Sequence, residues 1–194
     1  MAIKPILFNT EMVRANLDGR KTCTRRLVRF LPGENPQWTG YIRDGLMLYN
    51  GRNEPCIMKA PYQPGDILYV RETWCDDRQF THDSTPGRYF YKASESGNFK
   101  WKPSTHMPKE AARIFLKVTD VRMERLQKIT SEQICREGVE VEYPHVLNGE
   151  EKRYAFSTLW NSTIKKSDLD RYGWDANPYV FVIEFIRIDK PEEI

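Results

Sequence analysis

A ten-residue segment near the start of the chain carries the groups best suited to chemistry. Residues 17–26 read Leu-Asp-Gly-Arg-Lys-Thr-Cys-Thr-Arg-Arg, so an amine, two hydroxyls and three guanidinium groups lie close together. A threonine hydroxyl becomes a nucleophile when a neighbouring base takes its proton, and a lysine near other cations can be that base. Lys21 and Thr24 are therefore a candidate base and nucleophile. The neighbouring cations are Arg20, Arg25 and Arg26.

A carboxylate far along the chain is the third candidate group. Thr130 and Gln133 form a capping box that predicts a helix start, and Gly138 predicts its end. Glu137 then lies in the last helical turn, where the helix dipole disfavours an anion by roughly 0.3–1 kcal/mol. A residue that breaks a local rule is a candidate functional residue. The alternative to a catalytic role is a plain ion pair between Lys21 and Glu137. For residues 17–26 the alternative is a capped helix followed by a basic strand on the surface, without a site.

The elements around Lys21 and Thr24 must bring the two side chains together. Residues 5–8 predict a strand, and Asn9 or Thr10 can cap a helix that ends at Gly19. From residue 22 the β-branched content predicts a strand in which positions 22, 24 and 26 share one face. Lys21 has the opposite parity, so it meets Thr24 only from the turn before this strand or beside a bulge.

A second strand is expected to add to the same cleft. Residues 63–66 have Pro and Gly at the positions that a type II turn requires, and residues 67–72 follow as a strand. On that strand Leu68, Val70, Glu72 and Trp74 share a parity, which predicts an inward carboxylate and an inward indole. An inward acid at a strand end needs a partner. We expect the cleft to be lined by Lys21, Thr24, Arg26, Glu72, Trp74 and Glu137.

The remaining pattern predicts short elements and a curved sheet. A hairpin is expected within residues 41–49, a strand at 89–91 and a helix at 155–164. The apolar parity flips near Thr119 and Asp120, which predicts a bulge in a curling strand. Residues 179–186 are apolar at both parities, which predicts a central, buried strand.

These elements predict an α+β fold, a mixed β-barrel of about five to seven strands with short flanking helices. We expect residues 1–194 to form a single domain. Insertions are expected near 30–62, 75–110 and 138–155.

The charge of the chain is uneven rather than large. The net charge of +3 excludes a histone-like binder of nucleic acid, but residues 11–30 carry +4 and residues 124–151 carry −4. The two segments either pair with each other, form the basic and acidic sides of one cleft, or attract an anionic ligand to the basic side alone.

The four cysteines and three histidines are scattered without metal-ligand spacing. This pattern predicts neither a bound metal nor another cofactor. No apolar run reaches the length that spans a membrane, and the first residues lack the apolar stretch of a signal peptide. We therefore expect a cytoplasmic protein with reduced thiols and no membrane partner.

The segment at 19–26 resembles the signature of the ASCH domain, a branch of the PUA-like β-barrels, which runs Gly-x-Lys-x-x-Glu-x-Arg. Gly19, Lys21 and Arg26 match it, and Thr24 stands where many members have Glu. Over its full length the chain looks like the larger ASCH proteins encoded by phages and prophages. Shared segments include residues 62–66, 71–74, 106–108 and 174–178.

The threonine adds a more specific resemblance. A small bacterial ASCH enzyme that hydrolyses N4-acetylcytidine to cytidine and acetate has Gly-Arg-Lys-Thr-x-Thr at this place. The resemblance implies that Lys21 is the base, Thr24 the nucleophile and Glu137 the third catalytic residue of an amidohydrolase. Arg26 is then suited to stabilise the oxyanion.

Three other functions stay open on the sequence. A PUA-like module can bind RNA or a modified nucleoside without turnover, with Trp74 and Trp174 as stacking platforms for a base. Glu72 and Asn177 are then suited to hydrogen-bond a base edge. Arg20 and Arg26 are the candidate contacts for the rest of the nucleotide. Ribonuclease activity through Lys21 and Glu137 and a role in phage assembly are the remaining alternatives.

Overall fold

The structure is a computed structural model of the whole chain. It describes residues 1–31, 41–43, 46–49, 52, 54–79, 87–141 and 150–192, with the backbone alone at 41–43.

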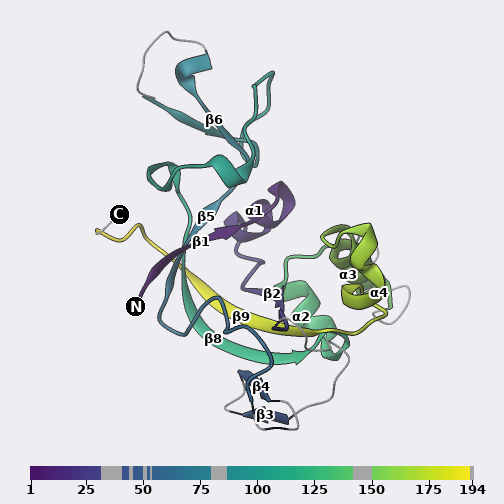
Figure 1. The fold of residues 1–194 in the computed structure, drawn as a ribbon. Coiled ribbons are helices and arrows are strands. Elements are labelled where there is room, and N and C mark those ends of the chain that lie inside the picture. The colour runs from purple at the N-terminus through teal and green to yellow at the C-terminus, as the bar shows by residue number, and fades with distance from the viewer. Residues whose placement is uncertain are drawn as a thin grey trace.

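A five-stranded mixed sheet with the order β1-β5-β8-β9-β2 forms the centre of the molecule. β1 runs parallel to β5, and every other neighbouring pair is antiparallel. β8 and β9 are the long curved strands that cross the body in Figure 1. The prediction of a central, buried last strand is confirmed, because β9 lies between β8 and β2. The strands are β1 (Ile3–Leu7), β2 (Cys23–Leu27), β5 (Ile67–Arg71), β8 (Phe115–Arg125) and β9 (Tyr179–Ile188).

The predicted bulge is confirmed on β8. The pairing of β8 with β9 shifts register between Val118 and Asp120, where the apolar parity changes in the sequence. The shift lets Leu116 and Val118 before it, and Val121 and Met123 after it, all be buried. A bulge of this kind bends a strand and increases its twist.

The α+β class is confirmed, but the sheet is not closed into a barrel. β1 and β2 are the two edges of the five-stranded sheet, and in the described part of the chain no backbone ladder joins them. Each edge strand has five residues, and a side chain bridges the space between them, since Arg26 Nη2 donates to the Leu7 carbonyl at 3.2 Å.

Two short helices next to the sheet begin and end as their sequences predict. Asn9 caps α1 (Thr10–Leu17) by accepting from the Met12 amide at 2.8 Å, and Gly19 follows the helix with φ of 75°. α2 (Ser131–Arg136) has the full capping box of Thr130 and Gln133. Gly138 follows it with φ of 85°, a conformation that glycine adopts without steric cost.

The other helices differ more from the prediction. α3 (Glu150–Ser162) begins before the expected start at 155, and α4 (Leu169–Tyr172) was not predicted. Five short 3₁₀ helices are also present in the described residues, two of them within the stretch at 101–111. They are η1 (Asp77–Gln79), η2 (Ser104–His106), η3 (Lys109–Ala111), η4 (Leu126–Lys128) and η5 (Lys166–Asp168).

Two hairpins stand away from the central sheet. β3 (Tyr41–Arg43) pairs with β4 (Met47–Tyr49), as expected for this stretch. β6 (Trp74–Asp76) pairs with β7 (Tyr89–Tyr91) in an arm that extends from the body in Figure 1. The expected strand at 89–91 is thus confirmed, whereas β6 was not predicted as a separate strand.

The hairpins lie within two of the three expected insertions. Parts of all three fall outside the described residues, so the insertion boundaries and the single-domain organisation stay predictions.

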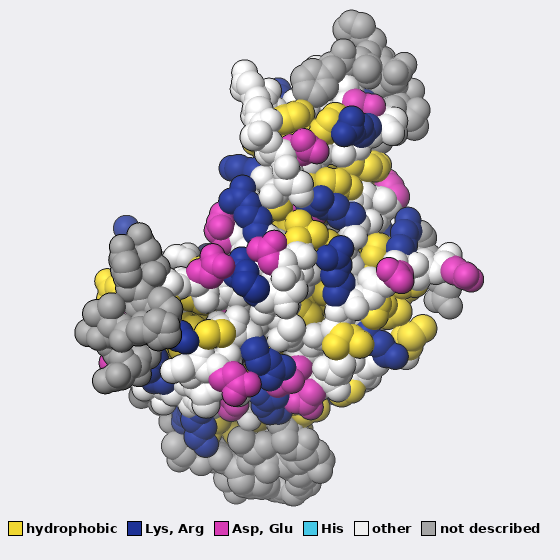
Figure 2. All heavy atoms as spheres, turned by 180° about the vertical axis from the view of Figure 1, so that it is seen from behind, with side chains coloured by type: hydrophobic (Ala, Val, Ile, Leu, Met, Phe, Trp, Pro, Cys, Tyr) yellow, Lys and Arg dark blue, Asp and Glu magenta, His cyan; other side chains and the backbone are white. Residues whose placement is uncertain are grey.

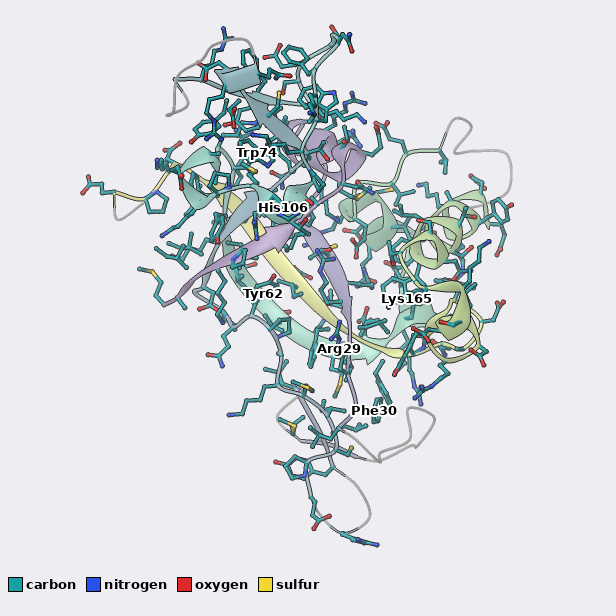
Figure 3. The ribbon with its side chains drawn as sticks, turned by 45° about the horizontal axis from the view of Figure 1, so that its top comes forward. Arg29, Phe30, Tyr62, Trp74, His106 and Lys165 are labelled. Carbon is teal, nitrogen blue, oxygen red and sulfur yellow. The ribbon has the colours of Figure 1, made fainter. Side chains whose placement is uncertain are left out.

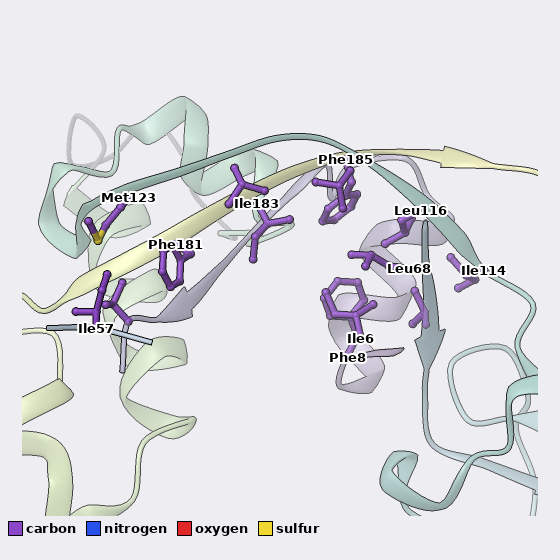
Figure 4. Close-up of a cluster of buried hydrophobic side chains, with 14 of the residues drawn as sticks. Ile6, Phe8, Ile57, Leu68, Ile114, Leu116, Met123, Phe181, Ile183 and Phe185 are labelled. Atoms are coloured by element: carbon purple, nitrogen blue, oxygen red, sulfur yellow. The ribbon is translucent and has the colours of Figure 1, made fainter. Parts of the chain in front are cut away.

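Three apolar clusters support these elements. The largest lies along the sheet and packs α1 against it, as the close-up in Figure 4 shows for Ile6, Phe8 and Leu116. The second joins α2 and α3 to the start of β9, and the third holds the arm. The second cluster fixes the position of α2, and therefore of Glu137 at its end.

Opposite charges meet on the surface and between the two charged segments. The rear view in Figure 2 shows Lys and Arg side chains beside Asp and Glu, without a broad region of one sign. Arg25 of the basic segment pairs with Glu124 and Glu137 of the acidic one. The segments therefore meet in space. No helix within the described residues is long and apolar enough to cross a membrane.

Candidate functional site

A cavity of about 780 Å³ lies between β2, the start of α1 and one side of α3. Its described lining has five Lys or Arg residues and one Glu, a net charge of +4, on otherwise largely apolar walls. Arg29 and Tyr62 belong to this lining, and both are labelled in Figure 3. The charged lining residues are Lys21, Arg25, Arg26, Arg29, Lys59 and Glu137. The apolar and aromatic lining includes Phe8, Met12, Tyr62, Phe156, Leu159, Trp160 and Ile164.

Lys21 lies in the turn before β2, which is one of the two positions that allow it to meet Thr24. Its side chain is buried, and Nζ donates to the Cys23 carbonyl at 2.8 Å. Nζ also donates to the Glu137 carbonyl at 2.8 Å and to Glu137 Oε2 at 2.9 Å. The Lys21 amine therefore has three hydrogen-bond acceptors, one of which is the Glu137 carboxylate.

Glu137 receives a second cation on its other oxygen. Arg25 Nη1 donates to Oε1 at 3.0 Å, while Arg25 Nη2 donates to Glu124 and to Gln133 Oε1. Gln133 Oε1 also accepts from the Thr130 amide, so the capping box that starts α2 is linked to the cavity. The carboxylate thus lies between two cations, which offsets its unfavourable position at the helix end.

Thr24 is buried, and its hydroxyl oxygen faces a guanidinium. Arg26 Nη1 donates to Thr24 Oγ1 at 2.8 Å and to the Arg25 carbonyl at 3.0 Å. Burial lowers the pKa of Arg26, yet an arginine stays protonated at neutral pH. Its hydrogen bond leaves the Thr24 hydroxyl hydrogen free to be donated, and the positive charge favours developing negative charge on the oxygen.

The route from Lys21 to Thr24 is indirect in this structure. No hydrogen bond joins Nζ to Thr24 Oγ1, although both residues line the cavity. A base must come within hydrogen-bond reach of the proton that it takes, and such contacts often form only with the substrate bound.

Gly138 lets α2 approach this site closely. A Cβ atom at Gly138 would lie 2.6 Å from Ala15 Cβ and 3.1 Å from Lys21 Cβ. Any larger residue would push α2 away from α1 and Lys21. The Glu137–Gly138 pair thus supplies both the carboxylate and the space for it.

Cys23 lies beside the ion pair but is a poor nucleophile. Burial and the nearby Glu137 carboxylate raise the pKa of its thiol to about 12. A thiol with so high a pKa is almost wholly protonated at neutral pH.

Glu72 and Trp74 are not among the residues that line this cavity, contrary to the expectation that they share the cleft. Arg113 binds both Glu72 oxygens, at 2.9 and 3.0 Å, and lies 4.0 Å from the centre of the Tyr91 ring. Trp74 belongs to the apolar cluster of the arm, and Figure 3 shows it well apart from Arg29 and Tyr62. The reason is that the chain leaves the central sheet after β5, so the parity of residues 68–74 does not continue one face.

Arg20, Trp174 and Asn177 also lie outside the cavity lining. Arg20 pairs with Asp18 and Glu140 on the surface. The Trp174 ring packs edge-on against Phe156, behind the cavity wall. Asn177 has φ of 47°, and its side-chain oxygen accepts from the Gln127 amide at 2.9 Å, so it closes a turn. The binding roles of these residues stay predictions.

The aromatic wall and the outer cations Arg29 and Lys59 were not predicted from the sequence. Phe8 lies under the site, 5.3 Å from Lys21 Nζ to the ring centre, and Trp160 is fixed by its Nε1 donating to the Tyr172 carbonyl. The helical spacing of Phe156 and Trp160 was visible in the sequence, but such spacing is typical of any core-facing helix. Arg29 and Lys59 carried no motif, so only the fold brings them to the cavity.

The arrangement provides groups that suit acid–base and nucleophilic chemistry. In the residues that the structure describes, no group of three or more His, Cys, Asp or Glu side chains is placed to hold a metal ion. Lys21, Thr24 and Glu137 all line one cavity. Two guanidinium groups, of Arg25 and Arg26, complete its polar end.

The crystal structure of an ASCH domain from Lactobacillus crispatus JV V101 aligns with 97% of this chain and 81% of its own, at 13% identity and a TM-score of 0.41. No family model and no curated protein sequence matches the chain.

Proposed function

We propose that this protein is an ASCH-type amidohydrolase that binds a cytidine-like nucleoside and removes an acyl group from its N4 atom. The observation that carries the proposal is that Lys21, Thr24 and Glu137, which the sequence separates by up to 116 positions, line one cavity. The aromatic wall of Phe8 and Trp160 is suited to hold a planar base.

The reaction starts with Thr24. Its Oγ1 attacks the acyl carbon, and Arg26 or backbone N–H groups stabilise the oxyanion that forms. The carbon–N4 bond then breaks, which leaves the acyl group as an ester on Thr24. Water hydrolyses this ester, and the products are cytidine and the free acid.

The ion pair moves the protons of this reaction. Nζ and Oε2 are 2.9 Å apart, so passage of one proton to Glu137 leaves a neutral Lys21 amine. That amine accepts the Thr24 proton as the attack proceeds, after a rotation of either side chain brings them into contact. The pair then delivers a proton to N4 of the departing cytidine, and no proton is lost in the cycle.

Incubation of purified protein with N4-acetylcytidine tests the proposal. We expect cytidine and acetate in equal amounts, and loss of both products with Lys21→Met or Glu137→Gln variants that remain folded by circular dichroism. Arg136→Gln is the matched control, because Arg136 lies in α2 but pairs with Glu184 outside the cavity lining. Absence of product with the unmodified protein would contradict the proposal.

A second function, binding of RNA or a modified nucleoside without turnover, is favoured by the positive charge of the cavity. Its lining carries a net charge of +4, and positive charge with aromatic side chains is typical of nucleic-acid sites. Cytidine binding without product formation, in a titration of tryptophan fluorescence, would support this function over hydrolysis.

A further inference from the structure

Two cations at the outer rim of the cavity are not used by the proposed chemistry. Arg29 follows β2, and Lys59 lies on the segment beside it, because the Met58 amide donates to the Arg29 carbonyl at 2.7 Å and residues Phe30 and Ile57 form a bridge. Both side chains are exposed. None of the ion pairs among the described residues includes Arg29 or Lys59, so both side chains remain available to a ligand.

The inner cations differ in this respect. Lys21 and Arg25 are neutralised by Glu137 and Glu124, and Arg26 donates to Thr24 and to backbone carbonyls. An anionic group of a ligand would therefore find the free positive charge at the rim and not at the inner end.

The part of the lining that comes from α3 and the residues after it is mostly apolar. It consists of Leu159, Trp160 and Ile164, with Thr163 beside them. The site thus has a polar inner end, an apolar side wall and a basic rim. A nucleotide has the same order of groups: a reactive base edge, a planar ring with its sugar, and a phosphate.

The spacing fits this orientation. Arg29 lies five positions after Thr24 in the chain, which corresponds to about 16 Å of extended chain. A phosphate at the rim therefore lies at the opposite end of the ligand from the reacting amide. The side chains of Arg29 and Lys59 are long enough to extend into the cavity and contact it. Arginine and lysine are the usual partners of phosphate groups.

We propose that the ligand of this cavity carries a phosphate, which Arg29 and Lys59 bind at the rim. The inference rests on the proposed function and names its substrate class: a cytidine nucleotide, either free or within an RNA strand, in preference to the neutral nucleoside. The phosphate group is common to both sources, and the experiment separates them.

Binding of three probes tests this inference: cytidine, cytidine 5′-monophosphate and a short single-stranded oligocytidine. We expect the monophosphate to bind at least about tenfold tighter than cytidine at low salt. In an Arg29→Gln/Lys59→Gln variant we expect the monophosphate to lose its preference over cytidine. The matched control is Lys128→Gln/Lys190→Gln, which removes two exposed cations outside the described lining and retains the preference.

The salt dependence then separates the two sources of phosphate. If the strand is the ligand, the oligocytidine binds tighter than the monophosphate, and the double rim variant lowers the slope of log K against log salt by about 1.4. If the free nucleotide is the ligand, the oligocytidine gains nothing over the monophosphate. Equal affinities for cytidine and its monophosphate would overturn the inference but leave the proposed function intact. Failure of all three probes to bind would also overturn the inference, while the N4-acetylcytidine assay decides the proposed function separately.

Discussion

Lys21 Nζ lies 2.9 Å from Glu137 Oε2, although the two residues are 116 positions apart in the chain. The contact is buried, and the Glu137 backbone carbonyl accepts from the same ammonium group at 2.8 Å. The end of α2 is therefore fixed to the turn before β2 by both the main chain and the side chain of one residue. The proposed reaction depends on this link.

Loss of the carboxylate should cost stability as well as activity. Glu137→Gln leaves the buried cations of Lys21 and Arg25 without their shared counter-charge, and breaking a buried ion pair typically costs about 3–5 kcal/mol. Urea unfolding measures this free energy. The control is Glu11→Gln, because Glu11 is largely exposed and such changes stay within about 0.5 kcal/mol. A loss below about 1 kcal/mol for Glu137→Gln would show that the pair is not buried as described.

Gly138 and Gly19 offer a matched comparison of steric effects. Both have positive φ, but a Cβ atom at Gly19 meets nothing within 4 Å, whereas one at Gly138 meets Ala15 at 2.6 Å. We expect Gly19→Ala to cost about 1–2 kcal/mol from the backbone alone, and Gly138→Ala to cost about 1–3 kcal/mol more. Thermal and urea unfolding of both variants check this. Equal losses would mean that α2 does not approach Lys21 so closely.

The arm should lose stability in acid through Asp76. This buried carboxylate accepts from Arg78 and Lys102, and the Arg78 hydrogen bond is the main reason that the pKa of Asp76 lies far below its usual range. A lowered folded-state pKa stabilises the fold above the unfolded-state pKa of about 3.9, and this stabilisation is lost as the pH falls further.

The difference in unfolding free energy between the wild type and Asp76→Asn should therefore be constant from pH 6 to 8 and shrink below about pH 4. Urea unfolding across this pH range measures it. Asp175→Asn serves as the control, because Asp175 is exposed. A difference that grows on acidification would reverse the sign of the effect and rule out this account of Asp76.

The Glu72→Gln variant tests whether Glu72 stabilises the arm or hydrogen-bonds a nucleotide base. Both of its oxygens are bound by Arg113, so Glu72→Gln should lower stability by about 1–3 kcal/mol and leave cytidine affinity unchanged. Unfolding and fluorescence titration of the same variant provide the two readings. Weaker cytidine binding at full stability would instead support the base-recognition role that the sequence analysis predicts.

Much of the fold was predictable because local signals and the fold agree. The capping box of Thr130 and Gln133, the glycine after each of α1 and α2, and the parity flip near Asp120 all have the predicted structure. Each of these signals acts within a few residues, so the sequence alone is enough to identify it.

The predictions that were wrong concern features that depend on where the chain turns in space. We predicted that Trp74 continues the face of β5, but the chain leaves the central sheet after β5. We also predicted a closed barrel, and closure depends on whether the two distant edge strands meet. Arg29 and Lys59 come to the cavity through a contact between the segments around residues 29 and 58. Such contacts between distant segments leave no periodic pattern in the sequence.

The role of Thr24 as nucleophile is tested most directly by the rate of cytidine formation from N4-acetylcytidine in two variants of that residue. Thr24→Ser keeps the hydroxyl that accepts from Arg26, whereas Thr24→Val keeps the shape of the side chain and removes the oxygen. We predict that Thr24→Ser retains measurable turnover and that Thr24→Val loses at least about 100-fold in kcat while still binding cytidine. Turnover by Thr24→Val at the rate of the wild type would contradict the account.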